Sequence, residues 1–197
     1  MNRSRRSIPS VALLSIAFLA CASWLAWRSP ATSAQQGTPP PSMVSANHKL
    51  LEKYVGTWDA EMKAAAAPGQ PPQVTKGKST SRLIGGGLWL VTDFEGSMMG
   101  APFIGHEVMG YDNHAKQYIL NWVDTSSTAM FAGEMQYDEK SHTLTGTIHG
   151  HDEAGVEMKW RATDEWKDAD TRVYAMHMKM GNGPEQEMLS ITYKRKK

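Results

Sequence analysis

Ten short segments of alternating polar and apolar residues follow one another along most of this chain, and they limit the folds open to it. The segments are residues 57–64, 74–84, 88–95, 104–111, 117–125, 129–137, 143–151, 156–166, 172–180 and 185–195. A period of two is typical of β-strands, and the Gly, Asn and Asp residues between the segments favour tight turns. No connection is long enough to hold a crossover helix, so the strands are expected to be antiparallel. We therefore predict an all-β protein, an antiparallel up-and-down barrel of about ten strands whose closure leaves no exposed edge.

A short N-terminal helix is expected immediately before the first strand. Asn47 can cap a helix over residues 48–55, where the apolar residues share one side. Gly56 then ends the helical pattern. The barrel domain is therefore expected to cover residues 47–197.

The first 34 residues are typical of an export signal. Three arginines within the first six residues precede an apolar run from Ile8 to Trp27, and small residues ending at Ala34 offer a site for a signal peptidase. Residues 35–46 are rich in Pro, Gly and Gln, which predicts an extended linker. We expect a protein that is exported to the periplasm or secreted.

Three alternatives remain open for this N-terminal segment. The apolar run is close to the length of a membrane span, so it can serve as an uncleaved anchor. Cys21 follows a small residue, as in lipoproteins, and residues 4–8 resemble a twin-arginine signal. Contact with a membrane is expected only through such an uncleaved or lipidated N-terminus.

The charge of the chain gives no support for nucleic-acid binding. Residues 1–34 carry four arginines and no acid, and the rest of the chain has 17 basic and 20 acidic residues. It therefore lacks the basic surface that a nucleic-acid-binding domain needs. Because Cys21 is the only cysteine, no intrachain disulfide can form, and packing alone must hold the fold.

A series of short motifs resembles a known bacterial family. In chain order the motifs are HKLL (48–51), GTW (56–58), GGGL (85–88), EGSMMG (95–100), PF (102–103), GYD (110–112), WVD with ST (122–124, 127–128) and ITY (191–193). In this order they resemble domain-of-unknown-function family 1579 (DUF1579), of the calycin or lipocalin-like superfamily, over residues 48–195. The resemblance implies a calycin-like barrel. It implies no established activity and assigns no catalytic residue.

A barrel of eight or more strands can enclose a cavity, which points to a small-molecule ligand. The candidates to line it are large side chains, namely Trp58, Trp89, Trp122, Phe131, Tyr174, Met176 and Met178. The candidates for a polar contact to the ligand are His106, Tyr111 and Asp124. A lining of aromatic rings and thioethers selects ligands by size and shape. We predict non-catalytic binding of a small, largely apolar molecule.

Other functions stay open on weaker patterns. The same cavity could serve an enzyme or a haem protein, although no histidine is clearly placed as an axial ligand and G-x-S-x-G and HExxH motifs are absent. Met176, Met178 and Met180 share one strand face and offer soft ligands for Cu(I) in a copper-handling protein, and His149 with His151 has a spacing that suits zinc. The methionines can instead fill an irregular barrel interior, and the two histidines can lie on the solvent-exposed face of their strand. We therefore predict no metal and no cofactor.

Overall fold

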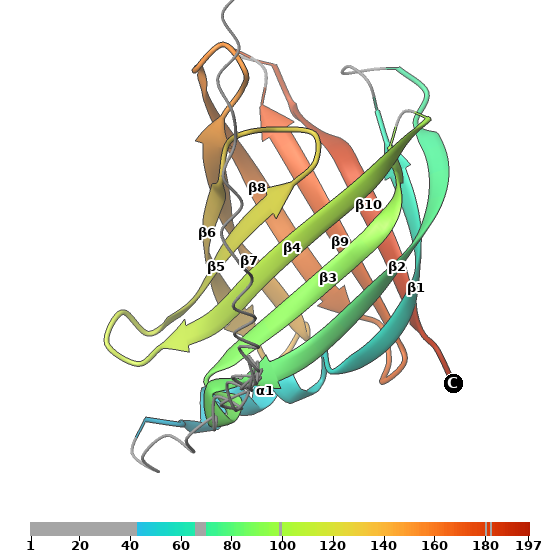
Figure 1. Cartoon of the computed structure of the whole chain (residues 1–197). Helices are drawn as coiled ribbons and strands as arrows, with labels where there is room; N and C mark the ends of the chain where they lie inside the picture. Colours follow the sequence, from blue (N-terminus) through green and yellow to red (C-terminus); the bar gives the residue numbers. More distant parts are fainter. Residues whose placement is uncertain (1–42, 66–69, 99, 180, 182) are drawn as a thin grey trace, which may run out of the picture. The chain divides into compact units, whose positions relative to one another are not determined.

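The chain forms a closed barrel of ten antiparallel strands (Figure 1). The computed structural model describes residues 43–65, 70–98, 100–179, 181 and 183–197. The strands are β1 (Gly56–Ala64), β2 (Gln73–Ile84), β3 (Trp89–Met98), β4 (Ala101–Asp112), β5 (Gln117–Asp124), β6 (Phe131–Asp138), β7 (Thr143–His151), β8 (Glu157–Trp166), β9 (Thr171–Lys179) and β10 (Glu185–Arg195). Each strand pairs with its neighbours in the sequence, and β1 closes the ring by pairing with β10. The predicted up-and-down barrel with a short N-terminal helix is confirmed.

The alternation within each strand places one set of side chains in the lumen. On β1, Trp58, Ala60 and Met62 are buried, whereas the residues between them are exposed. On β7, Leu144 and Ile148 are buried in the same way. Inward apolar residues of this kind supply the hydrophobic free energy that holds a barrel without disulfides.

Aspartates fix several of the hairpin turns. Asp112, Asp138 and Asp152 stand at or just after the ends of β4, β6 and β7, and each accepts hydrogen bonds from backbone N–H groups two to four residues later. Such bonds satisfy the backbone of a tight turn locally, without a partner strand. The chain therefore reverses where the sequence predicts it.

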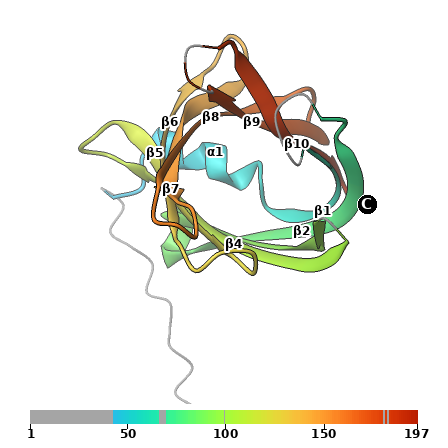
Figure 2. The ribbon, with the colours of Figure 1, turned by 90° about the horizontal axis from the view of Figure 1, so that it is seen from above.

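The N-terminal helical segment is shorter than predicted. It consists of the 3-10 turn η1 (Ala46–His48) and α1 (Lys49–Glu52). Leu50 and Leu51 of α1 are buried in the core. Figure 2 shows α1 lying within the ring of strands, and the helix closes one end of the barrel. In the described part of the chain no helix has the length and apolar character needed to span a membrane.

The cap of this segment also differs from the prediction. The residue that precedes the first turn is Ser45, not Asn47. The Ser45 backbone N–H donates to Nδ1 of His48 at 3.0 Å, so a histidine three residues ahead holds the start of the turn. The predicted signal segment lies outside the described residues, as do most of the predicted linker and Met180.

Candidate functional site in the barrel lumen

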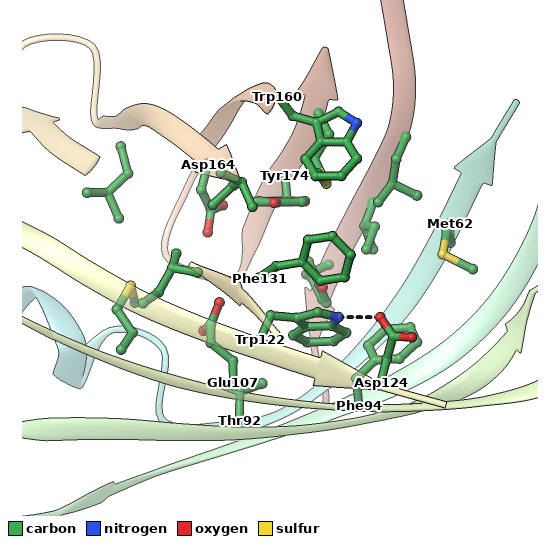
Figure 3. Close-up of a pocket in the computed structure, with 18 of the residues that line it drawn as sticks. Met62, Thr92, Phe94, Glu107, Trp122, Asp124, Phe131, Trp160, Asp164 and Tyr174 are labelled. Atoms are coloured by element: carbon green, nitrogen blue, oxygen red, sulfur yellow. Dashed lines mark hydrogen bonds between the residues drawn. The ribbon is translucent and has the colours of Figure 1, made fainter. Parts of the chain in front are cut away.

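A cavity of about 230 Å³ lies inside the barrel (Figure 3). Its lining extends from Tyr54, which follows α1, to Ser126, which follows β5 at the other end of the barrel. For scale, an apolar cavity of about 150 Å³ accommodates benzene. The lumen is therefore large enough for a small organic molecule.

Aromatic rings and methionines form a belt around the part of the cavity that is farther from α1. The belt consists of Phe94, Phe103, Trp122, Phe131 and Trp160 with Met62, Met98 and Met176. Phe103 stacks on Trp122, with 6.3 Å between ring centroids and 25° between the ring planes. Phe131 meets Trp160 edge to face at 5.4 Å. The belt offers a large apolar surface with few directed polar groups.

Two glycines on the inward face make room for these rings. A Cβ atom at Gly105 would collide with the indole of Trp122, and one at Gly150 would collide with the ring of Phe131. Because glycine has no side chain, each ring lies directly against the backbone of the neighbouring strand. A larger residue would push the rings inward, so these two glycines help to set the width of the cavity.

A polar layer lies deeper in the lumen, between the aromatic belt and α1. Its centre is an ion pair in which Nη1 of Arg172 donates to Oδ2 of Asp164 at 2.6 Å, with both side chains less than a tenth exposed. The guanidinium also lies 3.8 Å from the ring centroid of Tyr193. Burial raises the pKa of the Asp164 carboxyl, and Arg172 opposes that rise. An ion pair this well shielded from water is costly to break by removing one partner.

Glu107 extends from β4 into the same polar layer (Figure 3). Among the described residues, no group is placed to form a hydrogen bond or an ion pair with its carboxyl. Protein surrounds Glu107, and the part of its surface that stays accessible faces the cavity. Burial raises its pKa from 4.5 to about 7, with the charge of Arg172 opposing the rise and that of Asp164 adding to it. Near neutral pH this carboxyl is therefore divided between its protonated and ionised forms.

The cavity is acidic overall. Its described lining holds three carboxyl groups, those of Glu107, Asp124 and Asp164, against the one guanidinium of Arg172. Asp124 is at the end remote from α1, where it accepts hydrogen bonds from Nε1 of Trp122 at 2.6 Å and from the backbone N–H and hydroxyl of Ser126. This charge balance favours neutral or cationic molecules over anions.

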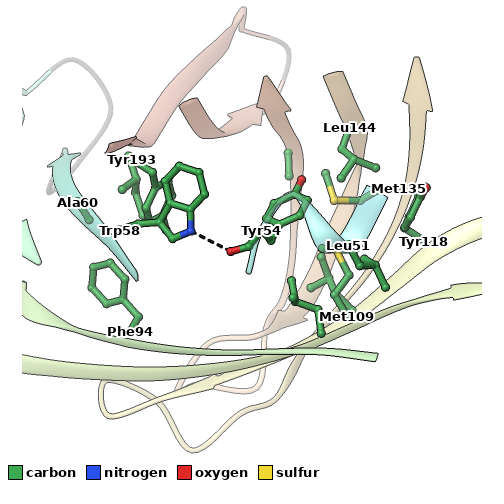
Figure 4. Close-up of a cluster of buried hydrophobic side chains, with 14 of the residues drawn as sticks. Leu51, Tyr54, Trp58, Ala60, Phe94, Met109, Tyr118, Met135, Leu144 and Tyr193 are labelled. Carbon is green, nitrogen blue, oxygen red and sulfur yellow. Dashed lines mark hydrogen bonds between the residues drawn. The ribbon is translucent and has the colours of Figure 1, made fainter. Parts of the chain in front are cut away.

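Tightly packed side chains seal the end of the lumen next to α1 (Figure 4). Trp58 is completely buried, and its Nε1 donates to the carbonyl oxygen of Tyr54 at 2.8 Å. Leu51 and Leu144 fill the space beside them with at most 1% exposure. A ligand is therefore expected to enter from the opposite end, past the aromatic belt.

A family model described as "Protein of unknown function (DUF1579)" matches residues 44–195 of this chain. The chain belongs to the DUF1579 family. No curated protein matches it. The barrel of this DUF1579 member is compatible with ligand binding, and the family itself assigns no activity.

A solved structure shares the architecture. Rv2717c from M. tuberculosis matches with a TM-score of 0.60 and 13% sequence identity, over 78% of this chain and 99% of that chain. At this identity the likeness shows the fold alone. A redesigned β-barrel is similar at a TM-score of only 0.38, with 12% identity over 75% of this chain and 95% of its own.

Half of the residues predicted to contact a ligand line the cavity of this DUF1579 member. They are Trp122 and Asp124 on β5, Phe131 on β6, and Tyr174 and Met176 on β9. The other five lie elsewhere. Trp58 is in the sealed core, Tyr111 packs against His48 near α1, and Met178 is half-buried outside the lining. Trp89 and His106 are exposed on the outer surface.

The side chain of His106, predicted to make a polar contact to the ligand, lies on the outer surface of the barrel. Strand β4 turns Phe103, Gly105, Glu107 and Met109 inward, so Ile104, His106 and Val108 face solvent. Nδ1 of His106 lies 2.8 Å from one oxygen of Asp93, and Arg82 donates to the other oxygen at 2.6 Å. These hydrogen bonds lower the pKa of Asp93. His106 therefore belongs to an external charge cluster.

The weaker metal candidates that the structure describes lie on β7 and β9. Met176 faces the cavity, whereas Met178 does not line it and Met180 lies outside the described residues. His149 lies on the outside of β7, with Nδ1 3.7 Å from a carboxylate oxygen of Glu134. No cluster of three or more His, Cys, Asp or Glu side chains suited to a metal occurs in the described part of the chain.

The sequence reasoning missed Glu107 and its neighbours Asp164 and Arg172. On β4 the apolar character of Ile104 and Val108 suggests that these side chains point into the barrel, yet they are 44% and 41% exposed. The alternative reading of β4, with Phe103 and Met109 inward, also satisfies the alternation and would have placed Glu107 in the lumen.

Proposed function

We propose that this DUF1579 protein is a binding protein that holds a small, largely apolar molecule in the barrel lumen. The observation that carries this proposal is the 230 Å³ cavity itself, closed by α1 and walled by aromatic rings and methionines. Rings and thioethers of this kind adapt to apolar ligands of varied shape. The ligand is expected to make few hydrogen bonds within the aromatic belt.

The affinity for a purely apolar ligand is expected to be low. Burial of roughly 300 Å² of apolar surface contributes about 7 kcal/mol at about 25 cal/mol per Å². Association costs at least about 4 kcal/mol of this, which leaves a Kd in roughly the millimolar range. A ligand bound more tightly must add a polar contact in the deeper layer.

Titration of the purified protein with the neutral fluorophore N-phenyl-1-naphthylamine tests the proposal. We expect saturable fluorescence enhancement with one probe per chain. Trp122→Ala should weaken binding by about tenfold, because it removes a ring from the cavity wall. Trp89→Ala is the matched control, since Trp89 is 38% exposed on the outer surface.

Met176→Ala and Met178→Ala form a second matched pair on the same strand. Only Met176 lines the cavity, so only its removal should change the affinity for the probe. Absence of probe binding by the folded protein would refute the proposal. Equal affinities for all four variants and the parent would do the same, because the lumen would then not be the binding site.

A further inference from the structure

We propose that the ligand carries a protonated amino group, which binds beside Glu107 while its apolar part lies in the aromatic belt. This inference rests on the proposed function and names the chemical class of the molecule. Its basis is a carboxyl group without a partner among the described residues, in a cavity whose other charged side chains each have at least one.

Each of the other charged groups in the described lining has a partner. Asp124 accepts hydrogen bonds from Trp122 and Ser126, and Asp164 accepts one from Arg172. Glu107 alone reaches the cavity without such a contact among the described residues. An ionised carboxylate in this position gains most from a ligand that brings a positive charge and several N–H donors.

In the described lining of the lumen, the one cationic side chain, Arg172, is already paired and offers no free charge to an anionic ligand. The guanidinium of Arg172 is paired with Asp164 at 2.6 Å and is covered by the ring of Tyr193. A ligand carboxylate would meet a guanidinium whose charge Asp164 already neutralises, and it would face the negative charge of Glu107. Carboxylate-bearing ligands such as fatty acids are therefore disfavoured, although the aromatic belt suits their chains.

The residues that flank Glu107 on the neighbouring strands are compatible with a bound ammonium group. In the sheet register Glu107 lies opposite Thr92 of β3 on one side and opposite Trp122 of β5 on the other. Trp122 lines the same cavity, and the face of an indole ring attracts cations. A protonated amine at this depth would thus meet a carboxylate and an electron-rich ring, with its apolar part directed toward the belt.

The charge state of Glu107 makes the expected binding depend on pH. The titratable and charged groups around it are Asp164 of β8, Arg172 and Tyr174 of β9, Tyr193 of β10 and Tyr54, which follows α1. The pKa values of these tyrosines are raised by burial, so they stay neutral, and Arg172 stays paired with Asp164. Between about pH 5 and about pH 8 the site therefore becomes more negative through Glu107.

The test compares three competitors that share one aromatic skeleton and differ in charge. They are 1-naphthylmethylamine, 1-naphthylmethanol and 1-naphthoate, each used to displace N-phenyl-1-naphthylamine at about pH 8 and about pH 5. At about pH 8 we expect the amine to bind the parent at least about tenfold more tightly than the alcohol, and the naphthoate to bind most weakly. At about pH 5 the preference for the amine should fall below about threefold, because Glu107 is then protonated.

Glu107→Gln should abolish the preference for the amine at about pH 8. Glu157→Gln is the matched control, since Glu157 is an exposed carboxylate at the start of β8, and it should keep the preference. The pH series on the parent gives the same information should Glu107→Gln fail to fold. The ratio of amine to alcohol affinity is the readout throughout, so a general change in the cavity does not imitate the effect.

Several results would overturn the inference and leave the proposed function standing. One is equal binding of amine and alcohol by a parent protein that binds the fluorophore. Another is a preference for the amine over the alcohol that persists in Glu107→Gln. A third is a preference that is lost in Asp124→Asn but kept in Glu107→Gln. Failure of the fluorophore itself to bind would refute the proposed function.

Discussion

Replacement of Glu107 by glutamine should change how the stability of the protein depends on pH. The pKa of Glu107 is raised to about 7 in the folded state, from 4.5 for the ordinary group. Between these values the folded protein binds more protons than the unfolded chain, so the free energy of unfolding falls as the pH rises. Glutamine has nearly the same shape and cannot ionise, so the variant loses this dependence.

The size of the effect follows from the two pKa values. One pKa unit corresponds to about 1.4 kcal/mol, and most of the interval between the two values lies between about pH 5 and about pH 8. The parent should therefore lose about 2–3 kcal/mol more than Glu107→Gln over that range. Water that enters the cavity lowers this figure, because it solvates the carboxylate.

Urea unfolding of both proteins at about pH 5, 6, 7 and 8 provides the measurement. The difference between parent and variant at each pH cancels the contributions of groups that titrate alike in both proteins. Glu157→Gln, at an exposed position at the start of β8, serves as the control. A parent-to-variant difference that stays constant from about pH 5 to about pH 8 would show that Glu107 is not desolvated, and the reasoning about the polar layer would be wrong.

Four further predictions test other parts of the structure. Gly105→Ala should displace the indole of Trp122, destabilise the protein by about 1–3 kcal/mol in urea unfolding and weaken fluorophore binding. Arg172→Leu should cost about 3–5 kcal/mol, because it leaves Asp164 buried without its partner, and a cost below about 1 kcal/mol would contradict the ion-pair argument. Haem titration should give no stoichiometric Soret band, since no histidine is among the described residues that line the cavity. Intact-mass measurement of the expressed protein should show a processed chain that begins near Gln35, and an acylated or unprocessed N-terminus would contradict this.

The barrel was predictable because its signals are local. The start and end of each predicted strand agree with the structure to within a few residues, as for residues 143–151 and 185–195, since alternation and turn residues act over short distances. Which face of a strand points into the barrel depends on more distant residues. On β4 both faces carry apolar residues, and only pairing with Thr92 and Trp122 on the flanking strands determines which face is inside.

The polar layer was harder to predict than the aromatic belt. Large rings are common in barrel interiors, so residues such as Phe131 and Tyr174 are natural candidates for the lining. Asp164 and Arg172 stand on different strands, and nothing in the chain between them marks them as a buried pair. Charged residues are seldom buried, so a sequence pattern assigns them to solvent unless their partner is known.

The seam between β1 and β10 has a consequence for how the protein folds. Nine of the ten strand ladders join consecutive strands and can form as hairpins while the chain is being made, but the seam joins Trp58 to Arg195 across nearly the whole domain. Closing so long a loop carries the largest entropic cost of any pairing in the fold, so ring closure is expected to be the slow event. Synthesis proceeds from the N-terminus, and β10 is the last strand to become available. Until then β1 remains an open edge, and the lumen has no continuous wall.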